Sequence, residues 1–298
     1  MEKQILFLTG LLGLAVSISA APIRIVTSVP DLADFARQVA GPLAQVDSLA
    51  NGVEDVHNVQ LKPSMVTRLA KADVFIQMGM DLEHAYAPAV LEESRNPKIQ
   101  LGQRGFIDTS KGVAAREVPR NIDRTEGEVH PCGNPHYNLD PEYAKLMVRT
   151  IAGSLSELYP EHQAAFQENT QKYLAQLDSK IREWKTRLCG KNIKFVSYHP
   201  AWVYFAERFG LQIIGTIEPK PGVEPGPRQI EELIALMKKE KVPLIVKESF
   251  YSDRIPNQIA AKTGARVINI PYMVGGLPQA ENYVRMMDCI VDSFAKTP

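Results

Sequence analysis

Short apolar runs and amphipathic stretches alternate along the first part of the chain. The β-branched run at 23–30 ends at a proline and predicts a strand, and the stretch after it predicts a helix with Asp31 as N-cap and Gly41 as its end. Alternating strands and helices indicate a parallel sheet with helices on both faces. The further expected elements are strands at 45–50 and 73–79 and helices at 63–72 and 81–94.

A long amphipathic segment occupies the middle of the chain. Residues 106–133 have mixed charge and few apolar positions, so we expect a surface loop there. Helices are predicted at 141–159 and 161–188, and the second has apolar residues at helical spacing. At about 1.5 Å per residue it would be about 40 Å long. Such a helix between two α/β regions is expected to connect them stiffly.

The alternation restarts after Gly190. The predicted fold class is therefore α/β, with two lobes that each contain a mostly parallel sheet flanked by helices, joined by one long connecting helix. We expect a first lobe at 22–158, the connecting helix at 159–189 and a second lobe at 190–298, with ligand-binding loops in the cleft between the lobes. The expected strands are 194–198, 211–217, 243–249 and 265–270, and the helices are 201–210, 228–240, 255–264 and 281–295.

The N-terminus predicts export. Residues 4–18 are almost entirely apolar, with Lys3 before them and small residues at 19–21, which is typical of a signal peptide at 1–21. A transmembrane anchor is the alternative, but the run is shorter than the roughly 20 residues that span a membrane. No cysteine near the cleavage zone could carry a lipid. In a bacterium, the mature protein would be periplasmic, without a lipid anchor.

Composition and cysteine count add few constraints. The 298 residues have a formal net charge of zero, and no basic cluster with interleaved aromatics is present, so nucleic acid is not expected as a partner. There are three cysteines, and an oxidising compartment would permit one disulfide, with Cys189–Cys289 as the first pairing to test. Cys132 is interpreted as a small loop residue, or as a spare metal ligand.

Three histidines in distinctive frames carry the candidate chemistry. His57 lies in DVHNVQLKPS, His136 in NPHYNLDP and His199 in VSYHPAW. Neutral imidazole is a common zinc ligand, and three such groups nearly fill a tetrahedral site. Because two of these histidines belong to the predicted first lobe and one to the second, a bound ion would tie the lobes together.

The remaining histidines are weaker candidates. His84 and His162 are expected on the surface, whereas His130, six residues before His136, could also contact the metal. No H-E-x-x-H, C-x-x-C, P-loop or G-x-S-x-G pattern is present, which favours binding over catalysis.

These frames resemble those of the periplasmic metal-binding receptors of ABC importers, the zinc/manganese (ZnuA/TroA-like) group. In that family the first ligand precedes a Pro-Ser pair, matched by His57 with Pro63-Ser64, and the second lies in P-H-x-W-L-D-P, matched around His136. The third precedes an aromatic helix that ends in Y/F-G-L, matched by His199 and 209–211, and an E-P-(S/G)-P turn is matched at 224–227. The resemblance covers the whole mature chain and implies two α/β lobes hinged on a long helix.

One position departs from the family pattern. The family usually supplies an Asp as fourth ligand after the last strand of the second lobe, but here Pro271, Tyr272 and Met273 follow that strand. Glu248 is the first candidate for the fourth ligand, followed by Asp253, His130 or water. Alternatively, Glu248 orients a ligating histidine without touching the metal.

The resemblance and the histidines together predict a receptor and not an enzyme. We expect a monomer that captures Zn²⁺, with Mn²⁺ less favoured because nitrogen ligands suit zinc better, and delivers it to an ABC permease in the inner membrane. Affinity should fall below about pH 6.5, since histidine must be neutral to bind. A three-histidine zinc enzyme with an open water position is the main alternative. A third is an adhesin whose metal is structural.

Overall fold

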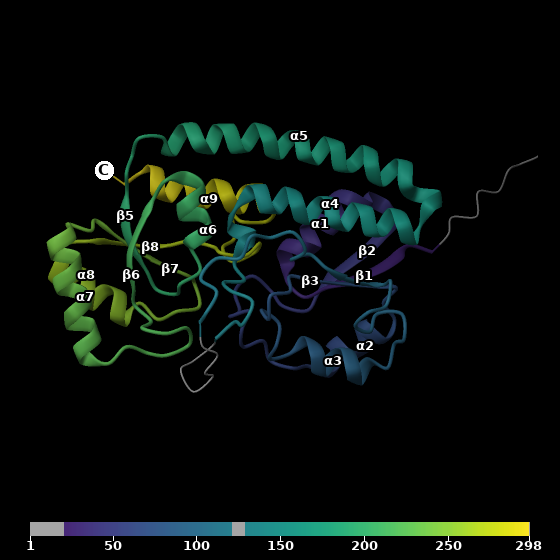
Figure 1. Cartoon of the computed structure of the whole chain (residues 1–298), viewed down its shortest axis with the longest axis horizontal. Helices are drawn as coiled ribbons and strands as arrows, with labels where there is room; N and C mark the ends of the chain where they lie inside the picture. The colour runs from purple at the N-terminus through teal and green to yellow at the C-terminus, as the bar shows by residue number, and fades with distance from the viewer. Residues whose placement is uncertain (1–20, 121–128, 298) are drawn as a thin grey trace, which may run out of the picture.

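Two four-stranded parallel sheets form the framework of the molecule (Figure 1). The computed structural model describes residues 21–120 and 129–297. The strand orders are β2-β1-β3-β4 and β6-β5-β7-β8, and every strand pair is parallel. The predicted α/β class with two sheets is therefore confirmed. Below, the first sheet with its helices is the first lobe, and the second sheet with its helices is the second lobe.

The first lobe is built on a sheet whose two central strands, β1 and β3, are almost wholly apolar and buried, as expected of parallel strands covered on both faces. Its strands are β1 Ile23–Thr27, β2 Ala44–Ser48, β3 Val74–Gln77 and β4 Phe106–Asp108. Its helices are α1 Pro30–Ala40, α2 Pro63–Ala70, α3 Ala87–Ser94 and α4 Pro141–Leu158. Short 3-10 turns lie at Gly41–Leu43, Tyr137–Leu139 and Pro160–His162.

The second lobe repeats this plan. Its central strands β5 and β7 pair with each other and are buried almost throughout. The strands are β5 Lys194–Ser197, β6 Gln212–Thr216, β7 Leu244–Lys247 and β8 Arg266–Asn269. The helices are α6 Val203–Phe209, α7 Pro227–Glu240, α8 Arg254–Thr263 and α9 Tyr283–Ala295.

Helix α5, Gln163–Leu188, runs along one side of the molecule from the first lobe to the second, and packs on α1 and α4 of the first lobe and on α9 of the second (Figure 1). With 26 residues it is about 39 Å long, close to the predicted length. Its buried stripe includes Phe166, Leu177 and Trp184, at the helical spacing that the sequence indicates. The predicted lobe boundaries at 158/159 and 189/190 remain a prediction.

One apolar core continues from the first lobe into the second. It contains Ile25 and Phe75 of the first sheet, Trp184 of α5, and Phe195 and Leu244 of the second sheet. Close-packed interiors resist deformation, so a shared core of this kind limits movement of one lobe against the other.

The structure corrects the sequence prediction at three places. Residues 106–108, predicted as part of a loop, form strand β4, which pairs with β3; three residues are too few to show a strand periodicity. The helix predicted from 81 begins at Ala87, since 81–86 form turns. Asp31 is not the N-cap of α1, because the helix begins at Pro30 after Val29, and the carboxylate of Asp31 instead accepts the backbone N–H of Val274 at 2.8 Å.

The remaining expectations about the chain have mixed outcomes. Gly41 ends α1 with a positive φ of 54°, as expected of a helix-terminating glycine. The disulfide Cys189–Cys289 is not formed, and Cys132 is also a free thiol.

Among the described residues no helix is long and apolar enough to cross a membrane. The signal-peptide prediction lies, except for Ala21, outside the described residues.

Candidate metal centre

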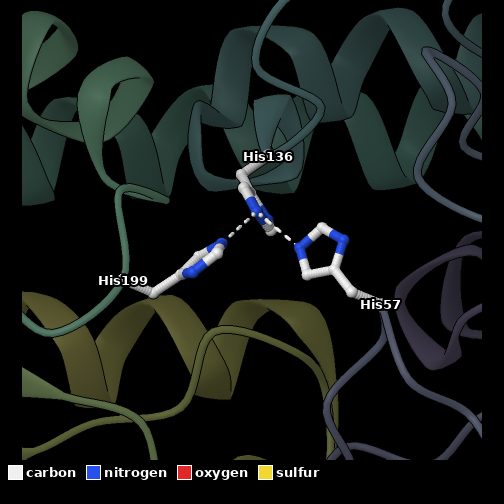
Figure 2. Close-up of side chains that lie close together, drawn as sticks. All are labelled: His57, His136 and His199. Carbon is white, nitrogen blue, oxygen red and sulfur yellow. Dashed lines mark hydrogen bonds between the residues drawn. The ribbon is translucent and has the colours of Figure 1, made fainter. Parts of the chain in front are cut away.

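The fold brings together the three histidines that are far apart in sequence. The Nε2 atoms of His57 and His136 lie 3.1 Å apart, and those of His136 and His199 lie 3.2 Å apart (Figure 2). The rings point toward a common centre from three different loops. All three residues are buried, with at most 4% of their surface exposed.

These distances fit a tetrahedral metal site. With Zn–N bonds of about 2.0–2.1 Å, two nitrogen ligands of a tetrahedral ion are about 3.3 Å apart. The observed 3.1 and 3.2 Å are close to that value, and a ligand atom from each ring lies within 4.8 Å of the others. The three imidazoles are therefore spaced as they would be on one face of a coordination tetrahedron.

His57 is held by a turn after β2. The Oδ1 atom of Asp55 accepts the backbone N–H of His57 at 3.0 Å, and its Oδ2 accepts the side-chain amide of Asn58 at 2.7 Å. An aspartate that bonds its own backbone two residues on stabilises such a turn. The backbone N–H of Val56 donates to the hydroxyl of Tyr272 in the second lobe at 3.1 Å. The loop of the first ligand is thus fastened to both lobes.

Asn134 positions His136 and connects it to the loop of His199. Its Oδ1 accepts the backbone N–H of His136 at 3.0 Å, while its Nδ2 donates to the carbonyl of Pro200 at 2.6 Å and to Glu117 at 2.8 Å. Gly133 is required before it, because a Cβ there would lie 2.6 Å from the carbonyl oxygen of Arg116. One amide therefore aligns the second and third ligand loops.

Glu218 orients His199. The Oε2 atom of Glu218 lies 2.8 Å from Nδ1 of His199, and both residues are buried. A carboxylate only accepts a hydrogen bond from an imidazole, so Nδ1 carries the proton and Nε2 is left to face the other two rings. This carboxylate–histidine pairing is typical of protein zinc sites and raises the basicity of the ligand.

The pKa values of the three histidines shift in different directions. Burial, followed by the charges of neighbouring histidines, holds the pKa of His57 and of His136 well below the usual value. Burial also acts to lower the pKa of His199, but the hydrogen bond and negative charge of Glu218 outweigh it and raise the pKa. His57 and His136 are therefore neutral and ready to bind a metal near pH 7, whereas His199 holds a proton more tightly.

The three further candidates for the fourth ligand lie in different surroundings. Glu248 is buried, its Oε1 accepts the indole N–H of Trp202 at 2.8 Å, and its Oε2 has no hydrogen-bond partner among the described residues. It is not among the ligand atoms that lie within 4.8 Å of one another. Asp253 pairs with Lys247 at 3.0 Å and its side chain is 70% exposed. His130 has its ring centre 5.0 Å from that of His57.

Tyr272 lies beside the site where the family pattern would place an Asp. Its ring centre is 5.8 Å from that of His136, and burial raises its pKa well above the usual value, so its hydroxyl stays protonated. The phenol oxygen accepts the backbone N–H of Val56, and Tyr272 has no carboxylate to offer an ion.

Sequence reasoning missed Glu218 and Asn134 as parts of the site, whereas it placed Tyr272 near the missing Asp. Glu218 directly follows a predicted strand, as His199 does, and the parallel pairing of β5 with β6 puts both residues at the same edge of the sheet. That shared edge was an available signal. No comparable signal exists for Asn134, whose role depends on a contact with Pro200, 66 residues away.

A cavity of about 290 Å³ leads from the site to the surface. His130, His136 and His199 contribute to its lining, together with Glu218 and Lys220. The histidine cluster can therefore be reached from this side although its side chains are buried.

Comparison with known proteins agrees with this arrangement. Residues 25–297 match the family described as zinc-uptake complex component A, periplasmic. The chain is 25% identical over 288 residues to the iron-binding protein YfeA of Yersinia pestis, covering 93% of this chain and 87% of YfeA. It is 23% identical over 308 residues to the high-affinity zinc uptake system protein ZnuA of Yersinia pestis, covering 98% and 96% of the two chains.

A solved structure supports the fold. A crystal structure of ZnuA superposes with a TM-score of 0.78 at 24% identity, covering 93% of this chain and 99% of the other. Two α/β lobes on a long helix, with a buried imidazole cluster between them, define the class of metal-binding receptors of ABC importers. The chain belongs to the family of zinc-uptake complex component A, periplasmic. The alternative of a three-histidine enzyme gains no support from these relatives.

Proposed function

We propose that this protein captures Zn²⁺ between its lobes and delivers it to an ABC permease in the inner membrane. The observation that carries the proposal is the set of three buried Nε2 atoms, spaced 3.1 and 3.2 Å apart, which we assign as ligands from His57, His136 and His199. Imidazole suits zinc, whereas Mn²⁺ prefers oxygen ligands and is less favoured. The zinc named for one relative agrees with this choice, and the iron named for another is also compatible with imidazole ligands.

For the fourth ligand we propose Glu248. Its buried Oε2 atom has no hydrogen-bond partner among the described residues, and its negative charge and His199 act on each other's pKa. The ion would draw this carboxylate closer, since only the three imidazoles already lie within 4.8 Å of one another. Trp202 would keep the other oxygen in place.

The cellular setting is part of the same proposal. We infer a signal peptide at 1–21, a mature monomer in the periplasm without a lipid anchor, and lobes at 22–158 and 190–298 joined by a helical segment at 159–189. The core that continues through both lobes supports small loop or lobe movements on metal release, and not a wide hinge opening.

Zinc titration of the purified protein against a competing chelator tests the ligands. Loss of a residue that hydrogen-bonds to a metal ligand typically lowers metal affinity by about 10- to 100-fold. His57→Ala and His199→Ala each remove a proposed ligand itself, so each should lower the zinc affinity by more than that. Glu248→Gln should also weaken binding, because it removes the charge and the free oxygen while an amide oxygen can still accept from Trp202.

Two variants serve as controls. His162→Ala removes a histidine that packs on Phe166, and Asp253→Asn neutralises an exposed carboxylate; both should bind zinc as the wild type does. Unchanged affinity in both histidine-ligand variants would overturn the receptor proposal, while unchanged affinity in Glu248→Gln would reject only the fourth ligand.

A further inference from the structure

A second group of metal-ligating side chains lies next to the three-histidine site. Asp81, His84 and His130 each offer a ligand atom, and these atoms lie within 4.8 Å of one another. Asp81 and His84 come from the turn after β3, and His130 comes from the loop that leads to His136. The sequence places His84 on the surface, but the fold brings it to His130, with their ring centres 6.1 Å apart.

The turn that carries Asp81 and His84 is fixed in an unusual conformation. Gly79, Met80 and Asp81 have consecutive positive φ angles of 81°, 55° and 67°. Left-handed backbone is unfavourable at non-glycine residues and persists only where neighbours enforce it. Here the buried carboxylate of Glu83 enforces it by accepting the backbone N–H groups of Met78 at 2.7 Å and Gly79 at 3.2 Å.

The two histidines of this group are set up to ligate. Nδ1 of His84 lies 3.0 Å from the carbonyl oxygen of Asp81, an acceptor, so this nitrogen carries the proton and Nε2 has a free lone pair. His130 is buried, with 9% of its surface exposed, and the backbone of Asp81 contacts its ring with a geometry looser than that of an ordinary hydrogen bond. A buried imidazole held only by such a loose contact can offer a nitrogen to an ion.

Two cavities make the group accessible, and one of them is shared with the three-histidine site. A cavity of about 280 Å³ is lined by Asp81 and His84, whereas His130 lines the cavity of about 290 Å³ that leads to His136 and His199. His130 thus lies between the two groups, with its ring centre 5.0 Å from that of His57 on the other side.

We propose that Asp81, His84 and His130 form a second site for a divalent transition-metal ion. Two imidazoles and one carboxylate are a donor set that zinc accepts in proteins with an open fourth position. Because Asp81 and His84 are only partly buried, this site binds more weakly than the buried three-histidine site. The protein therefore holds two ions per chain at high zinc concentration.

The test is a zinc equilibrium-dialysis series on the purified full chain, with metal measured by atomic absorption. The wild type should bind two ions, and His84→Ala and Asp81→Asn should each bind one while the tight affinity stays within about twofold of wild type. His57→Ala should lose the tight ion and keep the weak one. His162→Ala serves as the matched histidine control and should bind two ions.

His130→Ala separates this proposal from the use of His130 as fourth ligand of the three-histidine site. Loss of the weak ion, as in His84→Ala, supports the second site. If His130→Ala weakens the tight site while His84→Ala changes nothing, or if the wild type binds a single ion, the second site is refuted. Circular dichroism of each variant checks its folding. Retention of the tightly bound ion in His84→Ala would show that the three-histidine site is intact. Failure of the second site would leave the proposed capture function untouched.

Discussion

At the scale of single residues, His199 differs from its two partners because a buried acid stands behind it. Its Nδ1 donates to Glu218 at 2.8 Å, whereas Nδ1 of His136 has no hydrogen-bond partner among the described residues. Glu218 fixes the proton on Nδ1 and adds electron density to the ring, and it raises the pKa of His199 while burial depresses that of His136. His199 is therefore the most basic of the three imidazoles.

Replacing this acid should weaken zinc binding without unfolding the site. In Glu218→Gln the amide oxygen can still accept from Nδ1, but the negative charge is gone, so we expect the zinc affinity to fall by about 10-fold. The pKa of His199 should also fall, which NMR titration of the metal-free protein would detect. Glu232→Gln, an exposed acid on α7 that pairs with Arg228, is the control. Unaltered affinity and an unaltered pKa would show that Glu218 has no part in metal binding.

At the scale of elements, Asp140 links the helix behind His136 to the helix behind His199. It is the N-cap of α4, where it accepts the backbone N–H of Glu142 at 2.9 Å. Its two oxygens also accept from Arg208 of α6 at 2.7 and 2.8 Å. One buried carboxylate thus ends a loop of the first lobe and pairs with a helix of the second.

Graded substitutions separate these two contributions of Asp140. Asp140→Asn retains a capping oxygen but loses the ion pair, and Asp140→Ala loses both, so unfolding free energies should rank wild type, then Asn, then Ala. We expect the alanine variant to lose about 2–3 kcal/mol in urea unfolding of the metal-free protein. Glu157→Ala, at an exposed position near the other end of α4, should change stability by less than about 0.5 kcal/mol. Equal unfolding free energies for the wild type, Asp140→Asn and Asp140→Ala would contradict the proposal that Asp140 both caps α4 and pairs with Arg208.

At the scale of the whole molecule, buried carboxyl groups and buried histidines make stability depend on pH. Burial raises the pKa of Asp31, Glu83 and Glu248 to about 7, so each carboxyl stabilises the folded state below its unfolded pKa of about 4 and loses that contribution as the pH rises from there through 7. His199, with a raised pKa, acts in the same direction. His57 and His136 have lowered pKa values and act in the opposite direction, but their effect is nearly complete above the ordinary histidine pKa of about 6.5.

The metal-free protein should therefore become less stable between about pH 6.5 and 7.5, where the buried carboxyl groups still lose protons and the opposite effect of His57 and His136 is nearly complete. Urea unfolding in the presence of a chelator would show a free energy of unfolding that falls with pH, by at most about 1.4 kcal/mol per pH unit for each proton involved. Glu248→Gln should make the slope shallower. The free energy of unfolding of the zinc-loaded protein should fall less over this pH range, or rise, because zinc binding strengthens as the ligands lose protons. A rise in the stability of the metal-free protein over this range would contradict the raised pKa values of the buried carboxyl groups.

The sequence by itself determined the α/β class, the order of nearly all strands and helices, the long helix and the three histidine ligand candidates. These features are local, because strand and helix periodicities repeat over a few residues and each histidine has its own flanking frame. Strand β4, with only three residues, and the turns at 81–86, misread as helix, mark the limit of such local signals.

Only the tertiary structure decided which side chains surround the histidines. Asp31 resembles an N-cap in sequence but accepts from Val274, which is 243 residues away, and His84 looks like a surface residue until His130 lies beside it. Asn134 likewise acquires its role through a contact with Pro200, which is 66 residues away. Such contacts depend on how helices and sheets pack, and a pattern of neighbouring residues contains no information about the distance between residues that packing brings together.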